Sequence, residues 1–174
     1  MSWWGSARRS RLALAIGLPL LLVAILLGIS RRLPAVGQPV AFNHRKHTQG
    51  LKLDCQLCHQ YVTAGAHAGL PDAQTCIMCH RVRLGTTAEA ARVTELLARG
   101  GPLRFNKLFR LPPHVNFTHR RHVGIAKLPC QDCHGAIAET ERPPVRPLVT
   151  IRMRFCLSCH RATGQPADCV ACHR

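Results

Sequence analysis

The sequence is poor in aromatic and in acidic side chains. Phe, Trp and Tyr make up only 5% of its 174 residues, and 8 Asp and Glu stand against 24 Lys and Arg. The resulting formal net charge of +16 is typical of nucleic-acid binding or of attraction to an anionic membrane. Because so few aromatic side chains are available to stack on bases, we expect no nucleic-acid partner.

The sequence also has little from which to build an ordinary core. Much of its apolar content lies in one N-terminal run, and the remaining residues, about 140, contain few Phe, Trp or Ile. No segment shows a convincing strand pattern. We therefore predict a fold of mostly irregular chain and short α-helices, wrapped around an interior that a group other than side chains supplies.

One long apolar run lies near the N-terminus. Residues 12–29 read LALAIGLPLLLVAILLGI and contain no charged residue, and arginines lie on both sides of them. At a rise of about 1.5 Å per residue, a helix of this length reaches roughly 27 Å, which is enough to cross a thin bilayer. A cleaved signal peptide is the alternative, but no clear small-residue cleavage site follows. We predict one N-terminal transmembrane helix over 12–29 that stays attached.

Every cysteine lies in a C-x-x-C-H motif. The five motifs are CQLCH (55–59, motif 1), CIMCH (76–80, motif 2), CQDCH (130–134, motif 3), CLSCH (156–160, motif 4) and CVACH (169–173, motif 5). C-x-x-C-H is the attachment signature of c-type haem. Its two thiols form thioethers to the two vinyl groups of one porphyrin, and the histidine that follows reaches the iron as proximal ligand.

The motifs predict five covalently bound haem c groups. The cysteines that attach them are Cys55, Cys58, Cys76, Cys79, Cys130, Cys133, Cys156, Cys159, Cys169 and Cys172. The proximal iron ligands are His59, His80, His134, His160 and His173. Zinc sites and disulfide frameworks are the alternatives, but neither requires a histidine directly after every cysteine pair.

The haem motifs also predict the topology, because haem c is attached on the side of the membrane away from the cytoplasm. Residues 1–11 form a short cytoplasmic N-terminus, and the chain from about Arg31 onward lies in the periplasm at the inner membrane. Haem propionates offset much of the positive charge, and we expect arginine and lysine side chains to pair with them through charge-assisted hydrogen bonds.

The chain contains an internal repeat. Residues 38–59 align with residues 113–134 at a constant offset of 75, and motif 2 aligns with motif 4 at an offset of 80. We therefore predict a two-haem module over 30–84 and a three-haem module over 113–174, in which motif 5 is appended to the second copy. The segment between the modules, 85–112, is expected to form a linker helix and a loop.

The linker helix has recognisable ends. Thr87 is a good N-cap, and Gly100 and Gly101 terminate the pattern. Val93, Leu96 and Leu97 supply an apolar stripe between these ends. We interpret it as a packing helix with no chemistry of its own.

Six histidines lie outside the motifs, and each haem iron needs a sixth ligand. Four of them form duplicated pairs in the first histidine turn (FNHRKH, 42–47) and the second histidine turn (FTHRRH, 117–122). Positions i and i+3 of a helical turn share a face at different heights, so one turn can serve two neighbouring irons. We predict that the distal ligands include His44, His47, His119 and His122.

The fifth iron has two candidate distal ligands. His67 and His114 compete for it, and the sequence does not choose between them. Thioether ligation by Met78 or Met153 is a weaker alternative, because a methionine inside or just before such a motif more often contributes to packing.

The spacing F-x-H-x-x-H followed by C-x-x-C-H resembles that of the class III multihaem cytochromes c. In that family the first histidine ligates the haem of the next motif, and the second histidine ligates another haem. The resemblance implies that His44 and His119 serve the haems of motifs 1 and 3. It also implies that His47 and His122 serve the haems of motifs 2 and 4.

A closer resemblance covers nearly all of the chain after the apolar run. The segments AGLPDAQTCIMCH, GGPLRFNKLFRLPPHVNFTHRRHV, CQDCHG, IRMRFCLSCHR and CVACHR are similar to the pentahaem subunit of alternative complex III. This resemblance implies a membrane quinol oxidoreductase, with an iron–sulfur subunit and polytopic quinol-binding subunits as partners. It also implies a downstream electron acceptor, such as a cytochrome, a copper protein or an oxidase.

An iron with both axial positions filled has no open site for substrate, and the sequence contains no catalytic set of any specificity. We therefore predict an electron-transfer subunit rather than an enzyme. Two alternatives stay open. One is a free-standing, anchored cytochrome that shuttles electrons in the periplasm, and the other is a reductase whose fifth haem binds a small ligand such as nitrite.

Overall fold

The computed structural model of the chain describes residues 15–25 and 36–174. The predicted cytoplasmic N-terminus and both ends of the predicted anchor lie outside these residues. Residues 15–25 form a helix with exposed side chains. Among the residues described, none of the helices has the length and hydropathy needed to span a bilayer. The anchor over 12–29 therefore stays a prediction.

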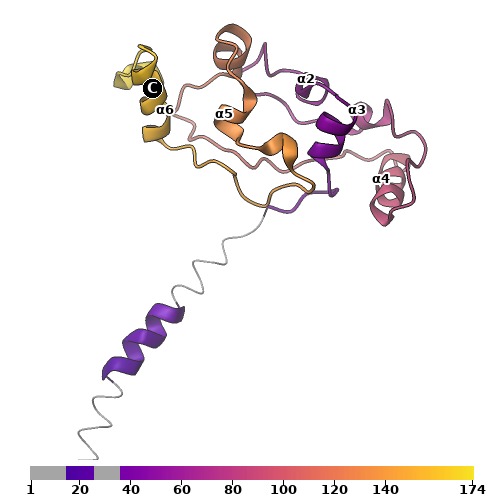
Figure 1. The fold of residues 1–174 in the computed structure, drawn as a ribbon, viewed down its shortest axis with the longest axis horizontal. Helices are drawn as coiled ribbons and strands as arrows, with labels where there is room; N and C mark the ends of the chain where they lie inside the picture. The colour runs from indigo at the N-terminus through magenta and orange to yellow at the C-terminus, as the bar shows by residue number, and fades with distance from the viewer. Residues whose placement is uncertain (1–14, 26–35) are drawn as a thin grey trace, which may run out of the picture. The chain divides into compact units, whose positions relative to one another are not determined.

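Residues 36–174 form one compact unit of short helices joined by irregular chain (Figure 1). Its helices are η1 (Lys46–Gly50), α2 (Cys55–Cys58), α3 (Ala73–Ile77), α4 (Ala88–Ala98), η2 (Arg120–Ile125), α5 (Cys130–His134), η3 (Ile137–Glu139), α6 (Met153–Ala162) and α7 (Cys169–Cys172). This part of the chain has no strand, and one isolated antiparallel bridge joins Val115 and His173. The prediction of short helices without a sheet is confirmed.

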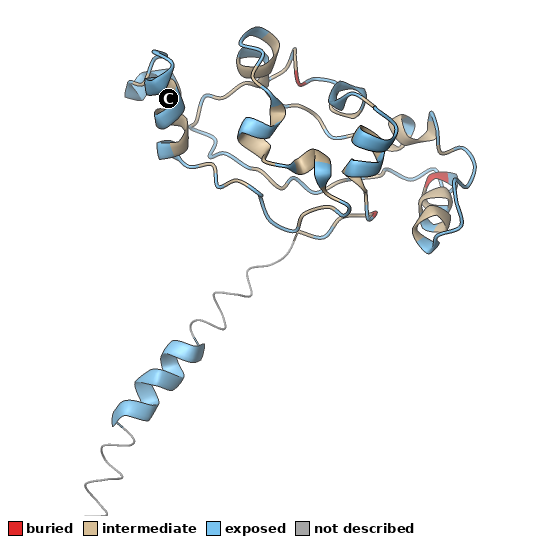
Figure 2. Cartoon of the chain, in the orientation of Figure 1, coloured by how far each residue is buried: buried red, intermediate tan, exposed pale blue. Residues whose placement is uncertain are grey.

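Very few side chains are buried in this unit. Among the described residues, the buried apolar side chains are those of Val40, Val62 and Leu97, each at 6% or 7% exposure. Polar side chains are buried nowhere in the described part of the chain (Figure 2). A soluble domain of this size normally buries a much larger set of apolar side chains. Protein side chains therefore contribute little interior here, as the composition predicts.

The helix predicted between the two modules is present as α4. Thr87 is its N-cap, and its hydroxyl accepts a hydrogen bond of 3.1 Å from the Ala90 amide. Gly100, just beyond the helix, has φ +68°, a left-handed conformation that glycine adopts at no steric cost. Glu89 in the first turn accepts a 2.6 Å hydrogen bond from the Ala41 amide. This bond ties α4 to the chain just before the first histidine turn.

The two histidine turns share an unusual backbone. Each begins in α-helical conformation and continues as a π-helix, η1 in the first turn and η2 in the second. After each π-helix a lysine adopts a left-handed conformation, Lys52 at φ 57° and Lys127 at φ 54°. Residues other than glycine rarely take such angles. Because this left-handed conformation occurs at both equivalent positions, the repeat extends to backbone geometry.

Each histidine turn is held by the other half of the unit. The Arg45 amide donates to the Thr140 carbonyl at 3.1 Å, and the Arg120 amide donates to the Gly65 carbonyl at 3.0 Å. The two bonds are equivalent, because the offset of 75 relates Arg45 to Arg120 and Gly65 to Thr140. We call this pair of bonds the reciprocal contact. It shows that the two copies of the repeat are interleaved within one unit.

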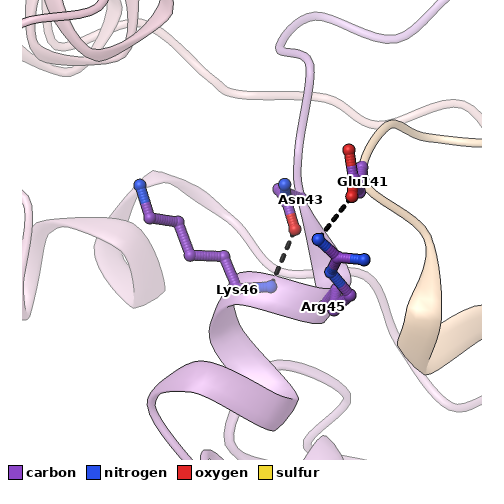
Figure 3. Close-up of polar contacts among 4 residues, drawn as sticks. All are labelled: Asn43, Arg45, Lys46 and Glu141. Atoms are coloured by element: carbon purple, nitrogen blue, oxygen red, sulfur yellow. Dashed lines mark hydrogen bonds and ion pairs between the residues drawn. The ribbon is translucent and has the colours of Figure 1, made fainter.

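Side chains reinforce one half of the reciprocal contact. Arg45 forms an ion pair with Glu141 at 2.5 Å, and the Lys46 amide donates to the Asn43 side chain at 2.7 Å (Figure 3). Both partners of the ion pair are more than half exposed, and such pairs typically contribute about 0.2–1 kcal/mol. The backbone bonds therefore define the contact, and the ion pair adds little to it.

A close backbone approach gives a test of this interleaving. A Cβ atom at Gly124 in η2 would collide with the carbonyl oxygen of Thr63, whereas one at Gly50 in η1 would meet no atom within 4 Å. We expect Gly124→Ala to lower the free energy of unfolding of the native protein by about 1–3 kcal/mol, because the two backbones must separate. Gly50→Ala should leave it unchanged or raise it by about 0.5–1 kcal/mol. Guanidinium unfolding followed by circular dichroism measures both variants, and equal midpoints would contradict the close approach.

Candidate haem-attachment motifs and histidine pairs

All five motifs lie on helical turns. In motifs 1, 2 and 5 the histidine amide donates to the carbonyl of the first cysteine at 2.8–2.9 Å, and motifs 3 and 4 lie entirely within α5 and α6. Positions i, i+3 and i+4 of a helical turn share one face. The spacing therefore brings both thiols and the imidazole of a motif to the same side of its helix, as attachment to a single porphyrin requires.

Aspartate caps mark where three of these turns begin. Asp54, Asp72 and Asp168 precede motifs 1, 2 and 5, and each accepts a hydrogen bond of 2.7–2.9 Å from a backbone amide in the turn that follows. The amide of Thr75, the largest cause, holds the pKa of Asp72 below its usual value. Since the chain has only 8 acidic residues, this use accounts for much of its negative charge. These carboxylates have a structural role.

The histidine side chains come together in pairs and not in larger metal-binding clusters. None of the ten cysteines forms a disulfide. In the described residues, no three His, Cys, Asp or Glu side chains are arranged to hold a metal ion by themselves. Histidine rings instead approach one another in pairs, and two is the number of axial positions that a porphyrin leaves on its iron.

Four pairs of histidine rings face one another across a short gap. Ring-centroid distances are 6.2 Å for His47 and His80, 6.4 Å for His119 and His134, 6.1 Å for His122 and His160, and 5.5 Å for His114 and His173. Two imidazoles on opposite sides of one metal, each bound at about 2.0–2.1 Å, have centroids roughly 6 Å apart. Three distances match this value and the fourth is slightly shorter. In every pair, one histidine comes from a motif and the other from outside the motifs.

Hydrogen bonds at Nδ1 orient many of these rings. The Nδ1 atom lies 2.7–2.9 Å from a backbone carbonyl oxygen in His47, His59, His119, His122 and His160. A carbonyl can only accept, so Nδ1 carries the hydrogen in each ring and Nε2 keeps its lone pair. Histidines that bind metals typically make such a bond with their other ring nitrogen. The rings are thus arranged to offer Nε2 as a ligand.

His44 lies against motif 1, although the contact differs from the four ring pairs. Its pKa is lowered to about 4, chiefly by burial and then by the nearby His59 and His47. Its Nδ1 lies 3.1 Å from the hydroxyl of Thr140, which itself donates to the Ile137 carbonyl at 2.8 Å. The hydroxyl oxygen therefore accepts from Nδ1, and Nε2 of His44 again keeps its lone pair.

Burial keeps several of these histidines neutral. It is the largest cause that lowers the pKa of His80, His119 and His134, and neighbouring histidines lower each of them further. A histidine must be neutral to bind a metal. The environment of these rings therefore favours the form that a ligand needs.

The phenylalanine of each histidine turn contacts both of its histidines. Phe42 stacks on His47 with centroids 4.4 Å apart and meets His44 edge-on at 4.8 Å. Phe117 repeats this arrangement in the second turn, at 4.7 Å and 5.0 Å. The sequence marks these phenylalanines by their repetition, and the structure shows that each one restrains two rings at once.

His114 and His67 lie in different places in the structure. The His114 ring stacks on the His173 ring at an interplanar angle of 24°, and the Arg174 amide donates to the His114 carbonyl at 3.2 Å. His67 lies instead beside His119, whose pKa it lowers after larger effects from burial and from other neighbours. Motif 5 therefore has His114 as its neighbour. Met78 and Met153 are largely exposed.

Sequence reasoning missed the groups that orient the rings. They belong to the loops after motifs 1 and 3, and they include the carbonyls of Ala66 and Gly69 and the hydroxyl of Thr140. Their residue types do not repeat between the two modules, so the alignment of identical residues ends before it reaches them. Thr140 and Ala66 lie at similar but not equivalent positions, six residues after His134 and seven after His59, so the repeat gives only a weak signal for them.

These residues fit a covalently attached porphyrin. Each motif presents two cysteine side chains and an imidazole on one side of a helical turn, and a second histidine lies close to each motif histidine. Hydrogen bonding leaves Nε2 available in the rings for which a bond at Nδ1 is seen. A bare zinc ion would instead require three or four such side chains around one point.

Two segments of the chain match known families. Residues 30–97 match the class III cytochrome c family, and residues 115–174 match cytochrome c7 and related cytochromes c. The multihaem cytochrome c subunit of menaquinone reductase from Nitratidesulfovibrio vulgaris (strain Hildenborough) is 27% identical over 161 residues, which cover 79% of this chain and 77% of that relative. The first module is thus similar to class III cytochromes c and the second to cytochrome c7, and the two matches together indicate a multihaem cytochrome c that transfers electrons.

Proposed function

We propose that this chain is the electron-transferring haem subunit of a membrane-bound quinone oxidoreductase. The observation that carries the proposal is the pairing of motif histidines with histidines outside the motifs, at the spacing of two ligands on one iron. Such an iron has no position left for a substrate. The role of the chain is therefore to pass electrons, and the transformation of the quinone takes place on a partner subunit.

The proposed cofactors are five haem c groups, attached through the ten cysteines of the motifs. Their proposed axial ligand pairs are His44 with His59, His47 with His80, His119 with His134, His122 with His160, and His114 with His173. When bound, these groups supply one-electron oxidation and reduction. His67 is left outside the ligand set.

The chain contributes rigid ligation to this chemistry. Carbonyl groups hold the Nδ1 hydrogens, and Phe42 and Phe117 restrain two rings each. Bonds of this kind fix ring orientation and raise the basicity of the ligating nitrogen. Because each of the first four proposed pairs contains at least one ring held in this way, we expect no ligand exchange at these irons when an electron arrives or leaves.

Two resemblances support a place in a membrane complex. The relative from N. vulgaris is named as a subunit of a menaquinone reductase. The motifs quoted above are similar to the pentahaem subunit of alternative complex III, a quinol oxidoreductase. Both complexes exchange electrons between a quinone pool and another redox partner, and we state the proposed function at that level.

The apolar run over 12–29 is proposed as the single anchor, with the haem-binding part on the periplasmic side of the inner membrane. The proposed partners are an iron–sulfur subunit, polytopic quinol-binding subunits and a downstream acceptor, which is a cytochrome, a copper protein or an oxidase. In this arrangement the chain connects the quinone site to the acceptor.

The choice between His114 and His67 can be tested by spectroscopy. We expect His114→Ala to convert one haem in five to a high-spin form that binds carbon monoxide, because motif 5 loses its second ligand. His67→Ala is the matched control and should keep every haem low-spin. Absorption spectra of the reduced protein with and without carbon monoxide measure both. A carbon monoxide complex in the His67 variant alone would contradict the assignment.

The membrane complex can be tested by gentle detergent extraction of native membranes, followed by native sizing and identification of co-migrating subunits. We expect the chain to migrate with iron–sulfur and polytopic subunits, and to be reduced or oxidised when a quinol or quinone is added. A lone monomer after mild extraction, with no redox response to quinone, would contradict the proposal and favour a free-standing shuttle.

A further inference from the structure

The contacts among the five motifs indicate a spatial order that differs from their order in the sequence. We propose that the motifs follow one another in space as motif 2, motif 1, motif 3, motif 4 and motif 5, so that electrons enter and leave the chain at the haems of motifs 2 and 5. This inference rests on the haem-binding function proposed above. It deepens that function by naming the two ends of the path.

The first histidine turn joins motif 2 to motif 1. His47 faces His80 of motif 2 at 6.2 Å, while His44, three residues earlier, lies beside His59 of motif 1. Phe42 contacts both rings of the turn, at 4.4 Å and 4.8 Å. Motifs 1 and 2 are therefore direct neighbours.

The reciprocal contact joins motif 1 to motif 3. The amides of His119 and Arg120 donate to the carbonyls of Ala66 and Gly65, in the loop after motif 1, at 3.1 Å and 3.0 Å. In the other half of the reciprocal contact, Nδ1 of His44 lies 3.1 Å from the hydroxyl of Thr140 in the loop after motif 3, so the two copies meet beside their first motifs. The His119 ring, which faces His134 of motif 3, bonds to the carbonyl of Ala66 in the loop after motif 1. The next motif in space after motif 1 is thus motif 3, although motif 2 follows it in the chain.

The second histidine turn joins motif 3 to motif 4. Phe117 contacts both His119, on the motif 3 side, and His122, which faces His160 of motif 4 at 6.1 Å. This link repeats the one between motifs 1 and 2, as the sequence repeat requires.

Motif 5 follows motif 4. The short loop between the two motifs folds back, because the carbonyl of Pro166 accepts a 2.7 Å hydrogen bond from Nδ1 of His160. The Asn116 amide donates to the Cys172 carbonyl at 2.7 Å, which places motif 5 beside the second histidine turn.

The contacts above give motifs 1, 3 and 4 two neighbours each, and motifs 2 and 5 one neighbour each. Figure 1 agrees with this order, because α3, α2, α5 and α6 follow one another across the unit, and the C-terminal end lies beside α6. Exposed apolar side chains lie at both ends of the series, Val82 just after motif 2 at 65% and Val170 within motif 5 at 82%. These two positions are suited to carry a probe.

The test injects electrons at one end and blocks one haem at a time. A cysteine in Val170→Cys is labelled with a photoreducing ruthenium complex, since the ten native cysteines are consumed in thioethers. On illumination the label gives one electron to a ferric haem, and a sacrificial donor then reduces the oxidised label. His44→Ala opens the haem of motif 1 and His47→Ala that of motif 2. Carbon monoxide holds the opened haem ferrous and so removes it from the path.

The two variants are matched, and the proposed spatial order and the sequence order predict opposite results for them. In the proposed order, blocking at His47→Ala leaves all other haems connected to the label, and all are reduced in the fast phase. Blocking at His44→Ala isolates the haem of motif 2, which loses its fast phase. If the haems followed the sequence order, the loss would occur in the His47→Ala variant instead, and the inference would be overturned.

A second set of variants tests the other end. With the label on Val82→Cys, blocking at His114→Ala should leave the fast phase of all other haems intact, and blocking at His122→Ala should remove it for the haem of motif 5. The opposite result, or no loss in either variant, overturns the order. If none of the four variants binds carbon monoxide, the proposed histidine ligation itself fails and the order falls with it. If they bind carbon monoxide but show the wrong pattern of loss, only the order fails.

Discussion

Two equivalent hydrogen bonds, from Arg45 to Thr140 and from Arg120 to Gly65, hold the haem-binding unit together. Each histidine turn faces motifs of its own module, but the residues that orient its first ring come from the other module. His44 is oriented by Thr140, and His119 is oriented by Ala66. A single copy of the repeat would therefore contain its ligands but lack part of what positions them. This explains why the two copies form one compact unit although the sequence reads as separate modules.

The scarcity of large apolar side chains in the sequence corresponds to the small number of buried apolar side chains in the structure. Only Val40, Val62 and Leu97 are buried among the described apolar residues, and they do not form the large interior of an ordinary helical domain. Short helices of four or five residues are also too short to be stable by themselves. Covalent attachment to large, flat, apolar porphyrins supplies both the missing interior and a fixed partner for each turn. The fold is thus specified by where the cysteines and histidines lie more than by a hydrophobic pattern.

Much of this arrangement could be predicted from residue types and spacing. The helical turns of the motifs, the helix after Thr87 and the absence of strands in residues 36–174 all follow from local rules and are present. The proximity of His114 to motif 5 could not be predicted, because it depends on a bridge between Val115 and His173 across a long stretch of chain. The left-handed backbone conformation of Lys52 and Lys127 could not be predicted either, since lysine has no intrinsic preference for a positive φ.

The spatial order of the motifs could not be predicted from the sequence, for a related reason. Sequence order suggests that motif 2 stands between motifs 1 and 3, whereas the bonds of His119 to Ala66 and of His44 to Thr140 show that the two copies meet beside their first motifs. Such contacts join the two copies of a repeat, and no local pattern encodes them. The anchor over 12–29 stays a prediction, because its ends lie outside the described residues.

The central claim is that every motif carries a haem whose iron has two histidine ligands. Spin-quantified electron paramagnetic resonance of the fully oxidised protein tests it most directly. The account predicts only low-spin ferric signals, which integrate to one iron for each of the five motifs per chain. A high-spin signal from any one iron, or an integral below that number in fully loaded protein, would contradict it.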